Sequence, residues 1–178
     1  MAANTTNALA KAAGVLLMGF DVDGVLTDGT LYFSTQGDEM KAFSSLDGHG
    51  LKMLLRAGVE VALISGRSSR ALELRAANLG IDELHMGVED KRALLARLAR
   101  QRSIEMAQTG YMGDDVVDLP VLRACGFSAT VADGHGEVLA RVDYVAGKDG
   151  GRGAVREVCD LIIRAQGKWD AAMAEYLA

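Results

Sequence analysis

The chain is short of several residue types, and each shortage narrows what the protein can be. It has one proline among 178 residues and about half of its residues are apolar, so a disordered chain is not expected. Its two cysteines, Cys125 and Cys159, lack metal-ligand spacing, which argues against a zinc site or a disulfide framework and fits a reducing compartment. No apolar run reaches membrane-spanning length, and the first eleven residues lack the organisation of a signal peptide, so we expect a cytoplasmic protein.

Positive charge is also scarce and scattered. The formal net charge is −5, and no long basic stripe occurs, so nucleic acid is not an expected partner. A membrane partner is not expected either, because no membrane-spanning run is present. An acidic protein that binds an anionic substrate needs a metal ion or a local cluster of lysine and arginine side chains.

Glycine is plentiful, with 21 residues, many of them directly after apolar runs, as in the strand-to-helix turns of α/β proteins. The hydrophobic pattern predicts strands at 15–20, 59–64, 84–86, 110–112, 127–131 and 144–145. It predicts helices at 51–57, from Ser68 or Ser69 to Gly80, and at 90–102, 117–124 and 154–165. Glycine-rich turns are predicted around His49 and His135, and a mobile loop at 147–153.

This alternation predicts an α/β fold class: a Rossmann-like, three-layer α/β/α domain with a parallel sheet. Two short strand-like pieces within about 31–43 flank a turn, so we expect a β-hairpin inserted into the domain. The domain is predicted to span 15–166, with an N-terminal extension at 1–14 and a C-terminal tail at 167–178. In such folds, ligands bind at the carboxyl ends of the strands.

Two aspartates stand at the end of the first predicted strand. Asp21 and Asp23 lie two positions apart, so their side chains point the same way. At about 4 Å and an effective dielectric constant of about 20, the two anions repel each other by roughly 4 kcal/mol. The pair therefore suits a divalent cation, or a nucleophile beside a general acid. The alternative is an Asp-Gly turn that closes the strand.

Three further elements fall at the same edge of the predicted sheet. Ser65 follows a strand and precedes a helix, where a hydroxyl and backbone N–H groups can bind phosphate, although a plain turn is the alternative. Lys91 opposes the dipole of the helix that it opens, which favours a functional role over a lysine that merely extends to solvent. Asp114 follows another strand and completes an oxygen-rich site for Mg²⁺, whereas Asp115 and Asp118 also fit a helix start.

These four elements, in this order, resemble the motifs of the haloacid dehalogenase phosphatase superfamily. The segments FDVDGVLTDGTLYF, LDGHGLKMLLRAGVEVALISGR, GYMGDDVVDLPVL and GGRGAVREVCDLI are similar to the 3-deoxy-D-manno-octulosonate 8-phosphate phosphatases within it. The resemblance covers about residues 16–166.

The resemblance implies a mechanism and a set of site residues. Asp21 would attack phosphorus, and Asp23 would protonate the leaving sugar alcohol and then activate water. Mg²⁺ would be held by Asp21, Asp114 and the backbone carbonyl of Asp23, while Ser65 and Lys91 would hold the phosphoryl oxygens. Contacts to a phosphorylated sugar acid would come from Asp23, Ser44, Ser45, Leu46, Asp47, Gly48, Lys52, Arg67, Arg75, Lys91 and Asp115. The hairpin would replace a cap domain and pack around the axis of a homotetramer.

Other activities remain open on the same residues. A phosphatase for nonulosonate 9-phosphates, or a broader sugar phosphatase, would carry identical motifs. A signalling module phosphorylated on aspartate, like a response-regulator receiver, has no need of Asp23, and 178 residues exceed a bare receiver by a hairpin and a helix. A scaffold that keeps the fold without the chemistry would not need four intact motif elements.

Overall fold

A computed structural model describes residues 2–177, so residues 1 and 178, the outer ends of the predicted N-terminal extension and C-terminal tail, lie outside it. Six parallel strands form one sheet in the order β5-β4-β1-β6-β7-β8. Their bounds are β1 (Leu17–Phe20), β4 (Glu60–Ile64), β5 (Glu83–His85), β6 (Thr109–Met112), β7 (Phe127–Thr130) and β8 (Tyr144–Val145). From β1 the chain runs to β4 and β5 on one side, and then crosses to β6 on the other. The carboxyl end of β1 is therefore the switch point, where ligands bind in such sheets.

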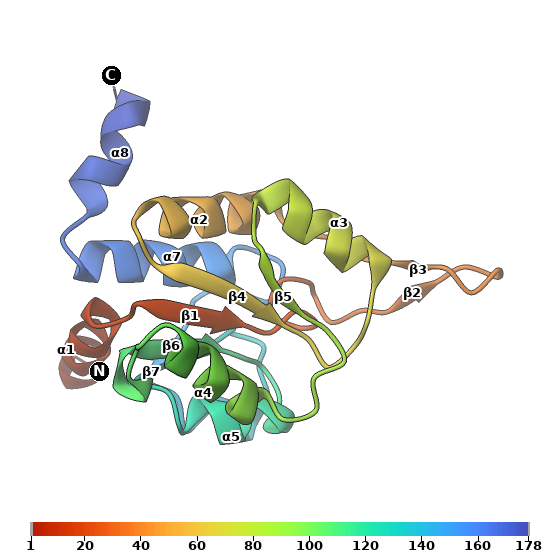
Figure 1. The fold of residues 1–178 in the computed structure, drawn as a ribbon, viewed down its shortest axis with the longest axis horizontal. Coiled ribbons are helices and arrows are strands. Elements are labelled where there is room, and N and C mark those ends of the chain that lie inside the picture. Colours follow the sequence, from red (N-terminus) through yellow and green to blue (C-terminus); the bar gives the residue numbers. More distant parts are fainter. Residues whose placement is uncertain (1, 178) are drawn as a thin grey trace.

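Helices cover both faces of this sheet, as the α/β/α prediction requires. The helices are α1 (Ala2–Ala13), α2 (Ser45–Arg56), α3 (Arg70–Leu79), α4 (Lys91–Gln101), α5 (Leu119–Leu122), α6 (Gly136–Leu139), α7 (Ala154–Ala165) and α8 (Trp169–Leu177), with 3₁₀ turns η1 (Met106–Gln108) and η2 (Val116–Asp118). Figure 1 shows α2, α3 and α7 along one side of the sheet, and α4 and α5 along the other. Across the described residues, none of these helices has the length and apolar character to cross a membrane.

Alternating residues of the strands point into two hydrophobic cores, one on each face of the sheet. Met18 and Met112 point into the core with α1, α2, α3 and α7, whereas their neighbours Leu17 and Tyr111 point into the core with α4, α5 and α6. All four side chains are fully buried. Because β1 is covered on both faces, its sequence is a continuous apolar run rather than an alternating one.

The predicted hairpin is present and short. Strands β2 (Tyr32–Phe33) and β3 (Glu39–Met40) pair antiparallel and form a separate two-stranded sheet. It projects from the end of the molecule toward which β1 points (Figure 1). Its large apolar side chains are exposed, Phe33 at 59% and Met40 at 62%, so this surface is free for contact with another chain.

The structure corrects the predicted turn around His49. Helix α2 begins at Ser45, so Gly48, His49 and Gly50 are helical rather than part of a glycine-rich turn. A Cβ atom on Gly48 would come within 2.0 Å of the Arg75 guanidinium, and one on Gly50 within 3.0 Å of the backbone of Arg156. The glycines therefore permit close helix packing, a requirement that a single sequence does not reveal.

Three other predicted segments show features that the sequence did not predict. The predicted helix 117–124 is reduced to η2 followed by the single turn α5, with Pro120 near the start of α5. The loop 147–153, predicted to be mobile, is anchored by two hydrogen bonds: the backbone N–H of Gly151 donates to the Val25 carbonyl at 2.9 Å and that of Gly150 to the Asp133 carboxylate at 2.9 Å. His135 lies in a turn as predicted, and its side chain caps α6, which the sequence did not predict.

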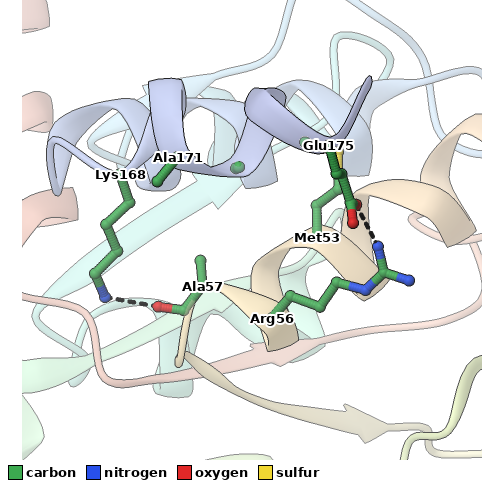
Figure 2. A pocket seen from close by; sticks show the side chains of 7 residues that line it. Met53, Arg56, Ala57, Lys168, Ala171 and Glu175 are labelled. Atoms are coloured by element: carbon green, nitrogen blue, oxygen red, sulfur yellow. Dashed lines mark hydrogen bonds and ion pairs between the residues drawn. The ribbon is translucent and has the colours of Figure 1, made fainter. Parts of the chain in front are cut away.

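The C-terminal segment forms α8, which lies against the end of α2. Figure 2 shows the Arg56–Glu175 ion pair, at 2.5 Å, and the bond from the Lys168 ammonium to the Ala57 carbonyl, at 2.7 Å. A cavity of about 290 Å³ lies between the two helices. Since Ala57 precedes β4, this cavity lies at the amino ends of the strands, opposite the edge where the candidate site residues gather.

Candidate active site

The acidic loop is held directly at the end of β1. The backbone N–H of Asp21 donates to the Met112 carbonyl at 2.9 Å, and the Val22 carbonyl accepts from Val25, Leu26 and Thr27 in a tight turn. Gly24 adopts a φ of +91°, and a Cβ atom there would lie 2.1 Å from a carboxylate oxygen of Asp114. Only glycine satisfies both the left-handed backbone and this close approach. The loop therefore brings Asp21 and Asp114 to one place.

Three carboxylates form the centre of the site. Oxygen atoms of Asp21, Asp114 and Asp118 lie within 4.8 Å of one another, and the side chain of Asp118 is fully buried. Burial, reinforced by the negative charge of Asp118, raises the pKa of Asp21 to about 8. The same two causes raise the pKa of Asp114 to about 7. The cluster therefore cannot hold all its negative charge at neutral pH without a compensating cation.

Lys91 provides part of that compensation. It begins α4, is 7% exposed, and its ammonium lies 2.9 Å from Asp21 and 2.8 Å from Asp118. Burial by itself would lower the pKa of Lys91, but the two carboxylates outweigh burial and raise it. One ammonium cannot balance three carboxylates, so the site still favours a further cation.

Asp118 organises the site more than its sequence position indicated. One of its carboxylate oxygens accepts from the Lys91 ammonium and, at 3.4 Å, from the Tyr111 hydroxyl. Its other oxygen accepts from the backbone N–H groups of Asp114, at 3.1 Å, and Asp115, at 3.4 Å. Asp118 therefore has a positioning role, because its side chain orients both Lys91 and the backbone that carries Asp114.

The donor set fits a hard divalent cation. Oxygen Oδ1 of Asp114 is buried and has no hydrogen-bond partner among the described residues. A buried, unpaired carboxylate oxygen is costly unless a ligand satisfies it. Carboxylate oxygens are the ligands that Mg²⁺ prefers. Asp21 and Asp114 are brought together as predicted.

The carboxylate of Asp23 lies apart from this cluster. It forms an ion pair with Lys41, the residue that follows β3, and its side chain is 21% exposed. The ligand predicted from Asp23 is its backbone carbonyl, so this pairing leaves that prediction open. Sequence reasoning missed Lys41, since a lysine after a short strand has no local feature that distinguishes it.

Ser65 is buried at the end of β4. Its backbone N–H donates to the His85 carbonyl at 2.9 Å, and its carbonyl accepts from Val88 at 3.0 Å. Its hydroxyl oxygen accepts from the backbone N–H of Arg67 at 3.1 Å. The oxygen is therefore fixed, and the hydroxyl hydrogen can be donated to a phosphoryl oxygen.

Most of the predicted contacts to the sugar already have protein partners. The carboxylate of Asp47 is buried and accepts from the backbone N–H groups of Gly153 at 3.1 Å and Arg156 at 2.8 Å, so it caps the start of α7. The guanidinium of Arg75 donates to the Ser44 carbonyl at 3.0 Å and lies over the Phe43 ring at 5.9 Å.

The remaining predicted contacts are more accessible. Arg67 is exposed, and its guanidinium donates to Glu39 at 2.8 Å. This contact, followed by the one from Lys41, lowers the pKa of Glu39 to about 2. Lys52 is half-buried on α2, and the exposed Asp115 accepts from the backbone N–H of Val116 at 2.7 Å. No bound sugar is needed to explain these contacts, so their role in binding stays a prediction.

One cavity joins part of the predicted contact stretch to a residue that the sequence did not single out. This cavity, of about 370 Å³, is lined by Ser44, Ser45 and Leu46 and, from the loop 147–153, by Arg152. Arg152 is 71% exposed on its side chain and lies 3.6 Å from Asp28. It is a cation on the wall of the cavity beside the predicted sugar contacts.

Comparison with known proteins shows that the chain is similar to phosphatases in sequence and in fold. No family model matches the chain. The chain is 44% identical over 168 residues to the 3-deoxy-D-manno-octulosonate 8-phosphate phosphatase KdsC of Escherichia coli K12, which covers 94% of this chain and 89% of that protein.

Two solved structures have the same fold. One is the 3-deoxy-D-manno-octulosonate 8-phosphate phosphatase of Yersinia pestis, with a TM-score of 0.90, 43% identity, and coverage of 92% of this chain and 89% of that one. The other is the corresponding phosphatase of Moraxella catarrhalis, solved with a magnesium ion, a phosphate ion and a KDO molecule. Its TM-score is 0.92, with 41% identity and coverage of 95% of this chain and 97% of that one.

Proposed function

This chain belongs to the 3-deoxy-D-manno-octulosonate 8-phosphate phosphatases of the haloacid dehalogenase superfamily, and we propose that it hydrolyses that sugar phosphate in a Mg²⁺-dependent reaction. The observation that carries the proposal is the cluster of Asp21, Asp114 and Asp118 with Lys91 at the carboxyl end of β1. Its surplus of negative charge suits a cation, and one of its carboxylates is free to attack phosphorus once that charge is balanced.

Asp21 is the nucleophile in this proposal. Its carboxylate oxygen forms a bond to phosphorus as the bond from phosphorus to the sugar oxygen breaks, and the carboxyl group of Asp23 gives its proton to that oxygen. Water then attacks phosphorus, its proton passes to Asp23, and the bond between Asp21 and phosphorus breaks to release inorganic phosphate. The two steps leave both aspartates as they began.

The chain's other polar groups serve this transfer. Asp21, Asp114 and the backbone carbonyl of Asp23 would hold Mg²⁺, which supplies positive charge to the phosphoryl oxygens when bound. The Lys91 ammonium, at the start of α4, and the Ser65 hydroxyl, at the end of β4, would donate to those oxygens, because both side chains are buried at this edge of the sheet. Asp118 keeps Lys91 in place.

The acid function of the sugar needs positive charge as well. Lys52, Arg67 and Arg75 are the cations proposed from family resemblance to face its carboxylate, with Ser44, Ser45, Leu46, Asp47, Gly48 and Asp115 as the further contacts. Residues 15–166 would form the phosphatase domain, with 1–14 as an N-terminal extension and 167–178 as a C-terminal tail. A cytoplasmic location fits the two cysteines, which are unpaired.

A homotetramer is the proposed assembly. The exposed apolar side chains of Leu31, Tyr32, Phe33 and Met40 gather on the hairpin, where the family resemblance places the subunit contacts. An apolar surface of this kind favours contact with another chain over exposure to water. Light scattering should give four times the chain mass, and Phe33→Ser should lower it. A monomer in the unchanged protein would refute this assembly.

Release of inorganic phosphate tests the proposed activity. The assay compares 3-deoxy-D-manno-octulosonate 8-phosphate with nonulosonate 9-phosphates and simple sugar phosphates, with Mg²⁺ and with a chelator. The highest kcat/KM should fall on the octulosonate ester, and Asp21→Asn should abolish turnover, whereas Asp82→Asn, an exposed position at the opposite edge of the sheet, should not. Full activity in Asp21→Asn would show that another group is the nucleophile.

A further inference from the structure

Lys41 is a buried cation on an otherwise exposed hairpin. Its neighbours Met40 and Ala42 are exposed, yet the Lys41 side chain is 2% exposed. A lysine ammonium is almost never buried to this extent without ionic partners. The position of Lys41 therefore has to be explained by the groups it contacts.

Two carboxylates contact the Lys41 ammonium from different elements. One belongs to Asp23 on the acidic loop, and its Oδ1 forms an ion pair with the ammonium. The other belongs to Glu39, whose Oε1 lies 3.0 Å from the ammonium. The second oxygen of Glu39 accepts from Arg67 at 2.8 Å. Lys41 thus joins the hairpin to the catalytic loop, and Glu39 fixes Lys41 from the hairpin side.

Asp23 depends on this contact for its orientation. Within residues 2–177, Lys41 is the one side chain seen to donate a hydrogen bond to the Asp23 carboxylate. The Asp21 carboxylate, in contrast, is held by both the Val22 backbone N–H and Lys91. With Oδ1 of Asp23 held by Lys41, the other carboxylate oxygen is the one that can face a reacting group.

We infer that Lys41 is a positioning residue for the proposed reaction: it fixes one oxygen of the Asp23 carboxyl group, so that the other oxygen faces the leaving oxygen of the substrate. This inference rests on the proposed phosphatase function and deepens it. It also means that the hairpin sets the geometry of proton transfer at the leaving group. Misplacing a catalytic group by about 1 Å can reduce the rate about a hundredfold.

Leaving-group dependence can separate this role from others. The quantity kcat/KM includes only the steps up to cleavage of the bond from phosphorus to the leaving oxygen. Phenol has a pKa of about 10, close to that of a tyrosine side chain, so phenolate departure benefits from a proton. p-Nitrophenolate is a stable anion and departs without one. Neither ester has a sugar, so the comparison is blind to sugar contacts.

The decisive variant is Lys41→Met, which keeps most of the side-chain length and removes the ammonium. We expect kcat/KM for phenyl phosphate to fall about 10- to 100-fold, within the contribution of a positioned general acid, and that for p-nitrophenyl phosphate to fall less than about threefold. Lys41→Arg should restore part of the loss. Lys11→Met, which removes an ion pair with Asp143 before β8, is the matched control and should change neither value.

Several results of this comparison would overturn the inference about Lys41. Equal losses for both aryl esters would indicate a merely structural anchor for the hairpin, and a loss confined to the sugar phosphate would indicate a substrate contact. In an Asp23→Asn background, Lys41→Met should add no further difference between the esters, and an undiminished difference would also refute the inference. The ratio of the two esters is measured on one sample, so it is independent of how much of a variant is folded.

Failure of the proposed function has a different signature. If the unchanged protein released no phosphate from any ester with Mg²⁺, or if Asp21→Asn kept full activity, the phosphatase assignment itself would fall, and the role of Lys41 with it. Activity that Asp21→Asn abolishes, combined with no selective effect of Lys41→Met, would leave the phosphatase standing and remove only the inference about Lys41.

Discussion

Without divalent cations, the free energy of unfolding of this protein should fall as the pH rises from about 5 to about 8. In the cation-free protein, burial and the charge of Asp118 raise the pKa of Asp21 from 3.8 to about 8 and that of Asp114 from 3.8 to about 7. Between pH 3.8 and about pH 8, the folded chain therefore binds more protons than the unfolded chain does. Stability falls with rising pH wherever the folded state binds more protons.

The magnitude follows from the number of protons. Each extra proton on the folded state gives a slope of about 1.4 kcal/mol per pH unit, so the two acids together give at most about 2.7 kcal/mol per pH unit between pH 5 and pH 7. For Asp21 alone, the full change in pKa corresponds to about 6 kcal/mol above pH 8. Typical domains have a total stability of about 5–15 kcal/mol, so even a fraction of this effect is measurable.

Urea unfolding at pH 5, 6, 7 and 8 measures the effect, with a chelator in one series and excess Mg²⁺ in the other. With the chelator, we expect the free energy of unfolding to fall by at least about 2 kcal/mol from pH 5 to pH 7. Mg²⁺ should add more stability at pH 8 than at pH 5, because the ion binds the ionised carboxylates of the folded state.

The variant Asp114→Asn is the internal control, since it removes one of the two titrating groups and keeps the shape of the side chain. Its slope with the chelator should be shallower than that of the unchanged protein, while the titration of distant groups is common to both. A flat or rising stability between pH 5 and pH 7 in the chelator series would refute the reasoning, and so would identical slopes in the two proteins.

Three further predictions concern single side chains. Lys91→Met leaves the buried carboxylates of Asp21 and Asp118 without their cation, so urea unfolding with a chelator at pH 8 should show a loss of about 3–5 kcal/mol; unchanged stability would contradict the pairing. Gly24→Ala should cost about 1–2 kcal/mol through its backbone alone, and should weaken Mg²⁺ binding in calorimetry because the new Cβ would meet a carboxylate of the site; unchanged affinity would contradict this. Asp47→Ala should lower stability in urea unfolding by about 0.5–2 kcal/mol, because the backbone N–H groups of Gly153 and Arg156 lose the carboxylate that caps α7; unchanged stability would contradict this cap.

Local patterns in the sequence determined the sheet and the positions of the reactive groups. The apolar runs before Asp21, Ser65 and Asp114 predicted buried strands, and all three residues do lie at strand ends. Since parallel strands end at one edge, adjacency in the fold followed from order in the chain. Helical spacing puts Lys91, Leu94, Leu95 and Leu98 on one face of α4, and that face is buried.

Tertiary structure alone decided which of these groups hold one another. The turn predicted around His49 is part of helix α2, and glycine is required at position 48 because Arg75, a residue from another element, fills the space beside it. Asp47 caps a helix more than a hundred residues away in the chain. Lys41 meets Asp23 because the chain that leaves β3 of the hairpin passes beside the acidic loop. Such contacts depend on distances between elements that are remote along the chain, and one sequence encodes those distances only through the packing of the whole molecule.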